Sequence, residues 1–316
     1  MNKRRILTKE MLQIIGTESE TNKFKVYKEN IIRFAESIQD YNPLFNNELE
    51  ARKSIYGGII APPTFLRSCY PGPWKKSIQL PFYTSVDGGS DWEYFEPIRD
   101  GDVINVTAKI TDLYEKSGHK EQMLLQKTTI KYINQFKSLV AKEENIGIFL
   151  EKHMHNEDKY PFSNIKTKTT NRFQNSKNKI ITYEDIYIGM ELPTIIKTPN
   201  SQQLVKYAAA SLEFPEIHYD IDYAKDAGLP GVLVQGSLKH AFLGQLITDW
   251  MGQNNILKKL SVSYRGMDIA NETLYCKGLI TEKYIEKNHN LVKSDIWIEN
   301  DKKIKKTFGE AIVQIN

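Results

Sequence analysis

A glutamate, a histidine and a glycine stand near one another in the second half of the chain. In SLEFPEIHYDIDYAKDAGLPGVLVQGSL, Glu213 and His218 are five residues apart, and Gly236 follows His218 by eighteen. A carboxylate and an imidazole can exchange protons with a reacting water molecule. Gly236 opens a run of apolar residues with helical spacing, and the first N–H groups of a helix have no partner inside it. The three residues therefore predict acyl chemistry, with the N–H facing an oxyanion.

The same pattern occurs once more, 173 residues earlier. IIRFAESIQDYNPLFNNELEARKSIYGGIIAPPTFL aligns without a gap to LVKYAAASLEFPEIHYDIDYAKDAGLPGVLVQGSLK. The aligned pairs that concern the site are Asp40 with Glu213, Phe45 with His218, and Pro63 with Gly236. The first copy keeps a carboxylate but has neither an imidazole nor, because proline has no N–H, a donor at the helix start. We therefore expect one active site per chain, in the second half.

Each copy predicts the same elements around these positions. An amphipathic helix (30–38 and 203–211) leads into a turn with a proline, a short helical turn and a glycine-rich bend, and an apolar helix follows. In the second copy this helix covers 236–251. Runs of alternating apolar and polar residues predict strands after each copy, at about 102–113, 123–134, 138–148, 257–264, 273–283, 291–299 and 305–315. Long antiparallel strands beside one apolar helix predict an α+β fold with a sheet wrapped around the helix.

A polar segment separates the two copies. Residues 151–179 are poor in aliphatic side chains and rich in Lys, Asn, Ser and Thr. We interpret them as a linker between domains at 1–150 and 180–316, whose sheets we expect to join edge to edge because a free strand edge invites aggregation. His153 and His155 lie in the linker, where no cysteine or further histidine stands at ligand spacing. We therefore expect no metal.

Length and composition restrict the class of protein. The chain has 316 residues, of which 40% are apolar, with a formal net charge of +4 and two cysteines. The length suits two packed domains, and the charge is too balanced to indicate a nucleic-acid partner. No apolar run is long enough to span a membrane, and no signal peptide is evident. Two cysteines make no disulfide framework, so we expect a cytoplasmic protein.

The second-half motif resembles the hydratase signature of MaoC-like proteins, (R)-specific enoyl-CoA hydratases and 3-hydroxyacyl-thioester dehydratases, which has the form D-x-N-P-L-H followed by H-G or Q-G. The first half, with IQDYNPLFNNELEARKSIYGGIIAPPTFL and GGSDWEYFEPIRDGD, resembles the N-terminal domain of the two-domain members. The resemblance implies a double hot-dog fold, two units each with a sheet around a central helix. It also implies that Glu213, His218 and the Gly236 N–H are the catalytic groups.

The resemblance also implies the substrate and its contacts. The substrate would be an acyl-CoA or acyl carrier protein thioester, and no cofactor would be needed. Lys239 and Arg265 could meet the phosphates of coenzyme A or phosphopantetheine, and Phe65 could line an acyl tunnel or simply pack against the sheet. We expect a homodimer, or a hetero-oligomer with another acyl-CoA enzyme.

The motif departs from the family pattern in ways that keep alternatives open. Glu213 replaces the family aspartate, and Pro215 and Glu216 replace the Asn-Pro pair. Either the loop is rebuilt around the longer side chain, or His218 acts with another acid such as Asp220 or Glu216, or hydration chemistry is lost. The leading hypothesis is a hydro-lyase. A non-catalytic acyl-thioester-binding subunit of a hot-dog complex and a hot-dog thioesterase are the alternatives.

Overall fold

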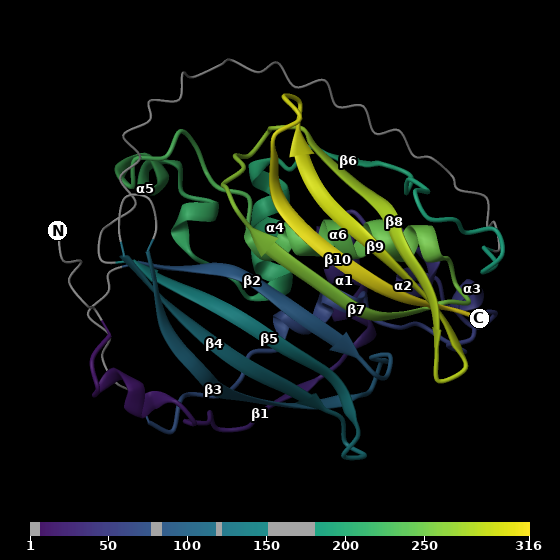
Figure 1. Cartoon of the computed structure of the whole chain (residues 1–316), viewed down its shortest axis with the longest axis horizontal. Helices are drawn as coiled ribbons and strands as arrows, with labels where there is room; N and C mark the ends of the chain where they lie inside the picture. Colours follow the sequence, from purple (N-terminus) through teal and green to yellow (C-terminus); the bar gives the residue numbers. More distant parts are fainter. Residues whose placement is uncertain (1–6, 77–83, 118–121, 151–180) are drawn as a thin grey trace.

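One long antiparallel sheet runs through the computed structural model of the protein, which describes residues 7–76, 84–117, 122–150 and 181–316. Its ten strands within these ranges follow the order β1-β3-β4-β5-β2-β7-β10-β9-β8-β6. The longer helices gather on one face of the curved sheet (Figure 1). This arrangement is a double hot-dog fold, as expected: strands of the first half form one side of the sheet and strands of the second half form the other.

The strands of the first half are β1 (Asn22–Lys25), β2 (Thr84–Tyr94), β3 (Val103–Ser117), β4 (Gln122–Ile133) and β5 (Leu139–Leu150). Those of the second half are β6 (Ile195–Lys197), β7 (Ile256–Tyr264), β8 (Leu274–Glu286), β9 (His289–Asn300) and β10 (Lys305–Ile315). All seven strands predicted from alternation are present. Burial alternates along β8 in LYCKGLI, for example, which is the periodicity that made these strands visible in the sequence.

The helices of the first half are η1 (Met11–Ile14), α1 (Lys28–Ser37), α2 (Pro43–Asn46), α3 (Glu48–Ala51) and η2 (Pro63–Ser68). Those of the second half are α4 (Ser201–Ser211), η3 (Glu216–His218), α5 (Ile221–Asp226) and α6 (Gly236–Met251). Helix α6 has the predicted bounds. Nearly all of its side chains are buried, because it packs against η2 and against strands β7 to β10.

The two halves of the sheet join where β2 pairs with β7. The register places Trp92 opposite Leu260 and Gly89 opposite Ser263. Gly89 has a φ of 131°, and a Cβ at this position would lie 2.2 Å from the Val262 carbonyl oxygen. Only glycine allows the two backbones to approach so closely here. The expected edge-to-edge joining is confirmed, and it leaves β1 and β6 as the outer strands.

The expectation of a long apolar helix in the first half is wrong for the described residues. Pro63, the counterpart of Gly236, begins the six-residue 3-10 helix η2. Pro71 and Pro73 follow soon after in the sequence, and because proline lacks an N–H and clashes with the preceding turn, a helix cannot continue through them. The sequence analysis also missed three strands, β1, β2 and β6. The linker with His153 and His155 lies outside the described residues.

Among the described residues, no helix has the length and apolar character needed to cross a membrane.

Candidate active site

Glu213 is held at the end of helix α4 by a fixed turn. Leu212 adopts a left-handed conformation with φ 59°, and the Glu213 N–H donates to the carbonyl of Ala208 at 3.1 Å. The Glu213 side chain extends toward helix α6, where its Oε2 accepts a short hydrogen bond from the hydroxyl of Ser237. Its other oxygen, Oε1, stands 3.9 Å from His218 Nε2. One oxygen of the carboxylate is therefore hydrogen-bonded to Ser237, and the other faces the imidazole.

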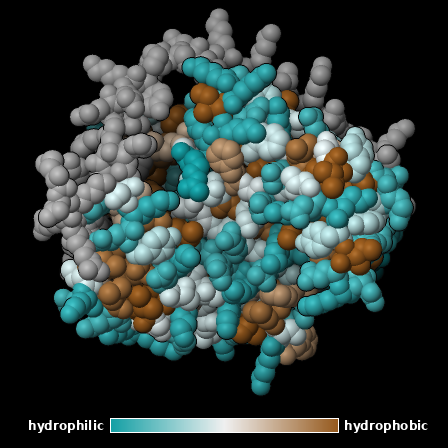
Figure 2. All heavy atoms as spheres, in the orientation of Figure 1, coloured by the Kyte–Doolittle hydropathy of each residue, from teal (hydrophilic) through white to brown (hydrophobic). Residues whose placement is uncertain are grey.

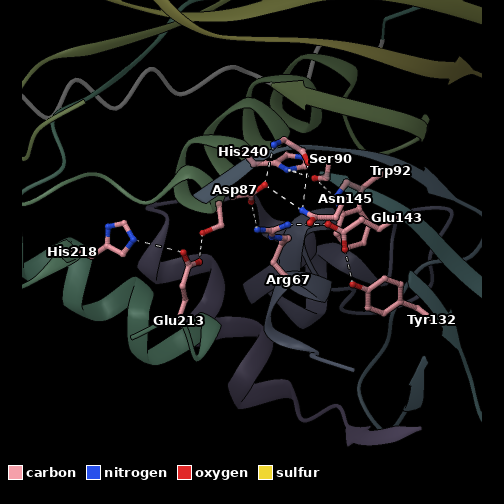
Figure 3. Close-up of polar contacts among 12 residues, drawn as sticks. Arg67, Asp87, Ser90, Trp92, Tyr132, Glu143, Asn145, Glu213, His218 and His240 are labelled. Atoms are coloured by element: carbon pink, nitrogen blue, oxygen red, sulfur yellow. Dashed lines mark hydrogen bonds and ion pairs between the residues drawn. The ribbon is translucent and has the colours of Figure 1, made fainter. Parts of the chain in front are cut away.

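His218 is oriented by a backbone carbonyl. Its Nδ1 lies 2.9 Å from the carbonyl oxygen of Leu233, which can only accept, so Nδ1 carries the proton. In the neutral ring, Nε2 is then an acceptor directed toward Glu213 (Figure 3). Burial lowers the pKa of His218, while the Leu233 carbonyl and the charge of Glu213 oppose this shift. The imidazole is therefore mainly neutral at pH 7.

Gly236 lies in the segment that holds both of these side chains. The Leu233 carbonyl accepts from His218 and the Ser237 hydroxyl donates to Glu213, so the start of α6, where the first N–H groups have no partner inside the helix, lies beside the pair. The segment is fixed by two further bonds: Val234 N–H donates to the Asp268 carbonyl at 2.9 Å, and Gln235 Nε2 donates to the Leu204 carbonyl at 3.0 Å. The structure thus brings together all three residues proposed from the sequence as catalytic.

Lys239 is placed differently from the expectation that it meets a phosphate. Its ammonium group is buried, donates to Asp268 Oδ2 at 2.8 Å and to the Gly266 carbonyl at 3.2 Å. Because these partners compensate its charge inside the protein, Lys239 anchors α6 to the loop after β7. It does not present a cation to a ligand arriving from solvent.

The other two predicted substrate contacts fall in contrasting places. Arg265 directly follows β7 and is exposed, so its side chain can still meet an anionic ligand. Phe65 is buried in η2, and its ring packs edge-on against Phe34 at a centroid distance of 5.6 Å. This environment favours the second of the two roles considered for Phe65, which is packing in the core.

The two alternative acid partners of His218, Asp220 and Glu216, do not face its imidazole. Asp220 caps helix α5 by accepting from the N–H groups of Asp222 and Tyr223, and Glu216 is exposed in η3. Neither is paired with His218 in the interactions of the described residues. Glu213 is therefore the carboxylate that the structure places beside the imidazole.

The equivalent positions of the first half form a different environment. Phe45 is buried, and Asp40 is buried beside the second half of the chain. Burial, and then the negative charge of Asp249, raises the pKa of Asp40 to about 7. The Lys197 ammonium lies nearby and donates to the Ile38 carbonyl at 2.8 Å. Asp40 is thus enclosed among groups from both halves rather than paired with an imidazole.

A buried charge cluster lies next to the site, and sequence reasoning missed it. Arg67 of η2 donates to Asp87 Oδ2 at 2.7 Å and to Glu143 Oε1 at 2.9 Å. Behind it, the Tyr132 hydroxyl donates to Glu143, and the Asn145 amide donates to Asp87 (Figure 3). The sequence signal was weak: a single arginine in the apolar run PTFLRSC and a glutamate at an inward position of a strand.

His240, the second histidine of this region, is enclosed in the core. His240 of α6 is fully buried, with Nδ1 3.5 Å from the Ser90 hydroxyl and its ring edge-on to Trp92. Burial, and then the positive charge of Arg67, lowers the pKa of His240 to about 3. This imidazole is therefore neutral at physiological pH, and its position beneath the sheet separates it from solvent.

A groove of about 1150 Å³ lies on the sheet, away from the predicted catalytic residues. Its charged lining residues include Lys142, Glu144, Lys259, Glu282, Lys293 and Glu310. Several of these form ion pairs with one another, such as Lys293 with Glu310 at 3.2 Å. The molecular surface in Figure 2 is largely hydrophilic, with hydrophobic residues scattered over it. The facing carboxylate and imidazole lie instead in the Glu213 region, outside this groove.

The fold and the site define a hot-dog protein of the dehydratase class, and comparison with known families agrees. The profile of the FAS1-like dehydratase domain region matches residues 13–143, and that of the MaoC-like domain matches residues 169–300. The chain belongs to the MaoC-like dehydratase family.

Two curated relatives carry the name UPF0336 protein. The protein from Thermobifida fusca is 29% identical over 102 residues, which are 31% of this chain and 67% of that protein. The protein from Streptomyces avermitilis is 30% identical over 104 residues, covering 31% of this chain and 69% of that protein.

Solved structures share the fold over nearly the whole chain. A MaoC-like dehydratase superposes with a TM-score of 0.77 at 18% identity, covering 96% of this chain and 99% of that one. A conserved hypothetical protein from Mycobacterium tuberculosis with a double hotdog fold superposes with a TM-score of 0.66 at 8% identity, covering 95% and 96%. At these identities the likeness concerns the fold alone.

Proposed function

We propose that the protein is an enoyl-thioester hydratase, or in the reverse direction a 3-hydroxyacyl-thioester dehydratase, acting on an acyl-CoA or acyl carrier protein thioester without a cofactor. The observation that carries the proposal is the facing pair of Glu213 and His218 at the start of α6. Their separation of 3.9 Å is too long for a direct hydrogen bond and short enough for one water molecule to contact both.

The hydrogen bonds around the pair support a specific division of tasks. Glu213 Oε1 and His218 Nε2 both accept, so a water between them can donate one O–H to each and direct a lone pair at the substrate Cβ. A neutral imidazole is a better base than a carboxylate at pH 7, since its pKa is closer to that pH. His218 therefore takes the proton, and the charge of Glu213 stabilises the imidazolium that forms.

The steps balance without any other reactant. The water O–H bond breaks as its oxygen bonds to Cβ, and the electron pair of the double bond moves toward the thioester oxygen. The N–H groups at the start of α6 stabilise the negative charge that develops there, helped by the positive end of the helix dipole. The proton on His218 then passes to Cα, which completes the addition and restores the neutral imidazole.

The test is hydration of a panel of enoyl-CoAs, followed as loss of the conjugated thioester absorbance with free thiol measured in parallel. The parent should hydrate at least one of them without releasing thiol. His218→Ala should lower kcat by ~10²–10⁴, the usual contribution of a positioned acid–base group. His289→Ala is the matched control, because His289 is exposed at the start of β9.

Two other outcomes would reject the proposal. Release of thiol at the rate of absorbance loss would indicate a thioesterase. Binding of enoyl-CoA with neither change would indicate a non-catalytic subunit that works with another hot-dog chain. In the first case, loss of thiol release in His218→Ala would place the hydrolysis at this site.

A further inference from the structure

Tyr264, the last residue of β7, lies against the first residue of helix α6. A Cβ at Gly236 would stand 3.0 Å from Cε2 and 3.2 Å from Cζ of the tyrosine ring. The carbon that bears the hydroxyl is thus part of the contact with Gly236. On the same ring, the Lys239 ammonium lies 5.5 Å from the centroid and is itself fixed by Asp268. The tyrosine ring is therefore held in place between β7 and the start of α6.

The hydroxyl of Tyr264 is buried and has no hydrogen-bond partner among the described residues. Buried polar groups in proteins are nearly always hydrogen-bonded, so an unpaired one requires an explanation. Packing against Gly236 does not provide it, because a phenylalanine ring would fill the same space. What sets Tyr264 apart is that its ring contacts Gly236, so a ligand atom bound at the start of α6 could accept the hydrogen bond of its hydroxyl.

The surroundings of Tyr264 favour a donor. Burial, and then the negative charge of Asp87, holds the pKa of Tyr264 well above its ordinary value, with Arg67 opposing and Tyr207 and Glu213 adding to the shift. The hydroxyl therefore keeps its proton and can donate it in a hydrogen bond. The contact of its ring with Gly236 places this donor at the start of α6, and the charge of Glu213 also acts on it.

We propose that Tyr264 is a catalytic residue whose hydroxyl donates a hydrogen bond to the thioester oxygen of the substrate, beside the Gly236 N–H. This inference rests on the proposed hydratase function and adds a second donor to its oxyanion site. Oxyanion sites commonly use two or more donors aimed at the oxygen on which charge develops. The first half cannot supply this second donor from its equivalent position, because Pro63, the counterpart of Gly236, has no N–H.

The test compares Tyr264→Phe with Tyr94→Phe. Tyr94 is also a buried tyrosine whose hydroxyl has no partner among the described residues, so both variants remove the same group. Tyr94 is five residues along β2 from Gly89, which pairs with Ser263, and at ~3.3 Å per residue this separates the two tyrosines along the sheet. Removing one oxyanion donor lowers kcat ~10²–10³-fold in enzymes where it has been measured. We expect about a hundredfold loss for Tyr264→Phe and less than threefold for Tyr94→Phe.

A spectroscopic measurement distinguishes a bound donor from a packing effect. A 4-dimethylaminocinnamoyl-CoA thioester absorbs at longer wavelength when its carbonyl oxygen is polarised. Bound to the parent or to Tyr94→Phe, this thioester should show a red shift, and bound to Tyr264→Phe it should show a smaller one. Equal red shifts and equal kcat values in the parent and Tyr264→Phe would overturn the role of Tyr264 while leaving the hydratase assignment intact. A parent that hydrates no enoyl-thioester would overturn both.

Discussion

Glu213→Asp tests whether the loop has been rebuilt around the longer acid. The substitution restores the residue type of the family motif but withdraws the carboxylate by one C–C bond, ~1.5 Å. The distance from the carboxylate to His218 Nε2, now 3.9 Å, would lengthen, and the hydrogen bond from Ser237 would be lost. The backbone cannot follow easily, because Leu212 is in a left-handed conformation and the Glu213 N–H is bonded to Ala208.

A misplacement of ~1 Å can cost on the order of a hundredfold in rate. We therefore expect Glu213→Asp to lower kcat for enoyl-CoA hydration about a hundredfold, with Glu213→Gln at least as damaging because the amide cannot stabilise an imidazolium. Circular dichroism and thermal unfolding would show that both variants fold. An Asp variant as fast as the parent, or faster, would refute the rebuilt loop and indicate a site that has decayed from the family form. A fully active Gln variant would make Glu213 a bystander.

Three further results are expected. Asp40→Asn should leave turnover within a few-fold of the parent. Because the pKa of Asp40 is about 7 in the folded protein and ordinarily 3.8, the free energy of unfolding of the parent should fall by at most about 4 kcal/mol as the pH rises from 4 to 8. In urea titrations over this range the variant should lose less. The acid limb of kcat/KM should lie below pH 6.5, because burial lowers the pKa of His218 and its neutral form is the base; a limb above pH 6.5 would contradict this. Lys239→Met should lower the free energy of unfolding by ~1–3 kcal/mol, because Asp268 loses its closer partner but keeps Lys306 at 3.3 Å, and an unchanged urea midpoint would show that the Lys239–Asp268 pair does not contribute to stability.

The sequence predicted what depends on periodicity and local spacing. Strands such as β8 and β10 and the helix α6 follow from alternation and from apolar residues at helical spacing, which burial imposes directly. The pairing of Glu213 with His218 followed from a short motif, since five residues of one loop cannot separate far. Strand β1 pairs over four residues only, and too short a run carries no readable alternation.

Contacts between residues far apart in the sequence could not be predicted from periodicity or local spacing. Lys239 was expected to be available to a ligand because its partner Asp268 is 29 residues away in a loop after β7. The bond from Ser237 to Glu213 and the approach of Tyr264 to Gly236 likewise join segments that only the tertiary fold brings together. The ungapped repeat led to one wrong prediction, a long apolar helix in the first half like α6 in the second. Pro71 and Pro73 exclude such a helix.

The two halves depend on each other at both of their equivalent sites. In the first half, Lys197 and Gln245 of the second half donate to the carbonyl of Gln39, so the remnant site is closed by its neighbour. In the second half, burial and then the negative charge of Glu213 raise the pKa of Tyr70 well above its ordinary value, so a first-half residue lies within the field of that carboxylate. The first half has therefore lost the groups for chemistry but kept its contacts with the site. Because β2 also covers the edge of β7, a second half separated from the first would expose that edge and lose the first-half residues that lie beside the proposed active site.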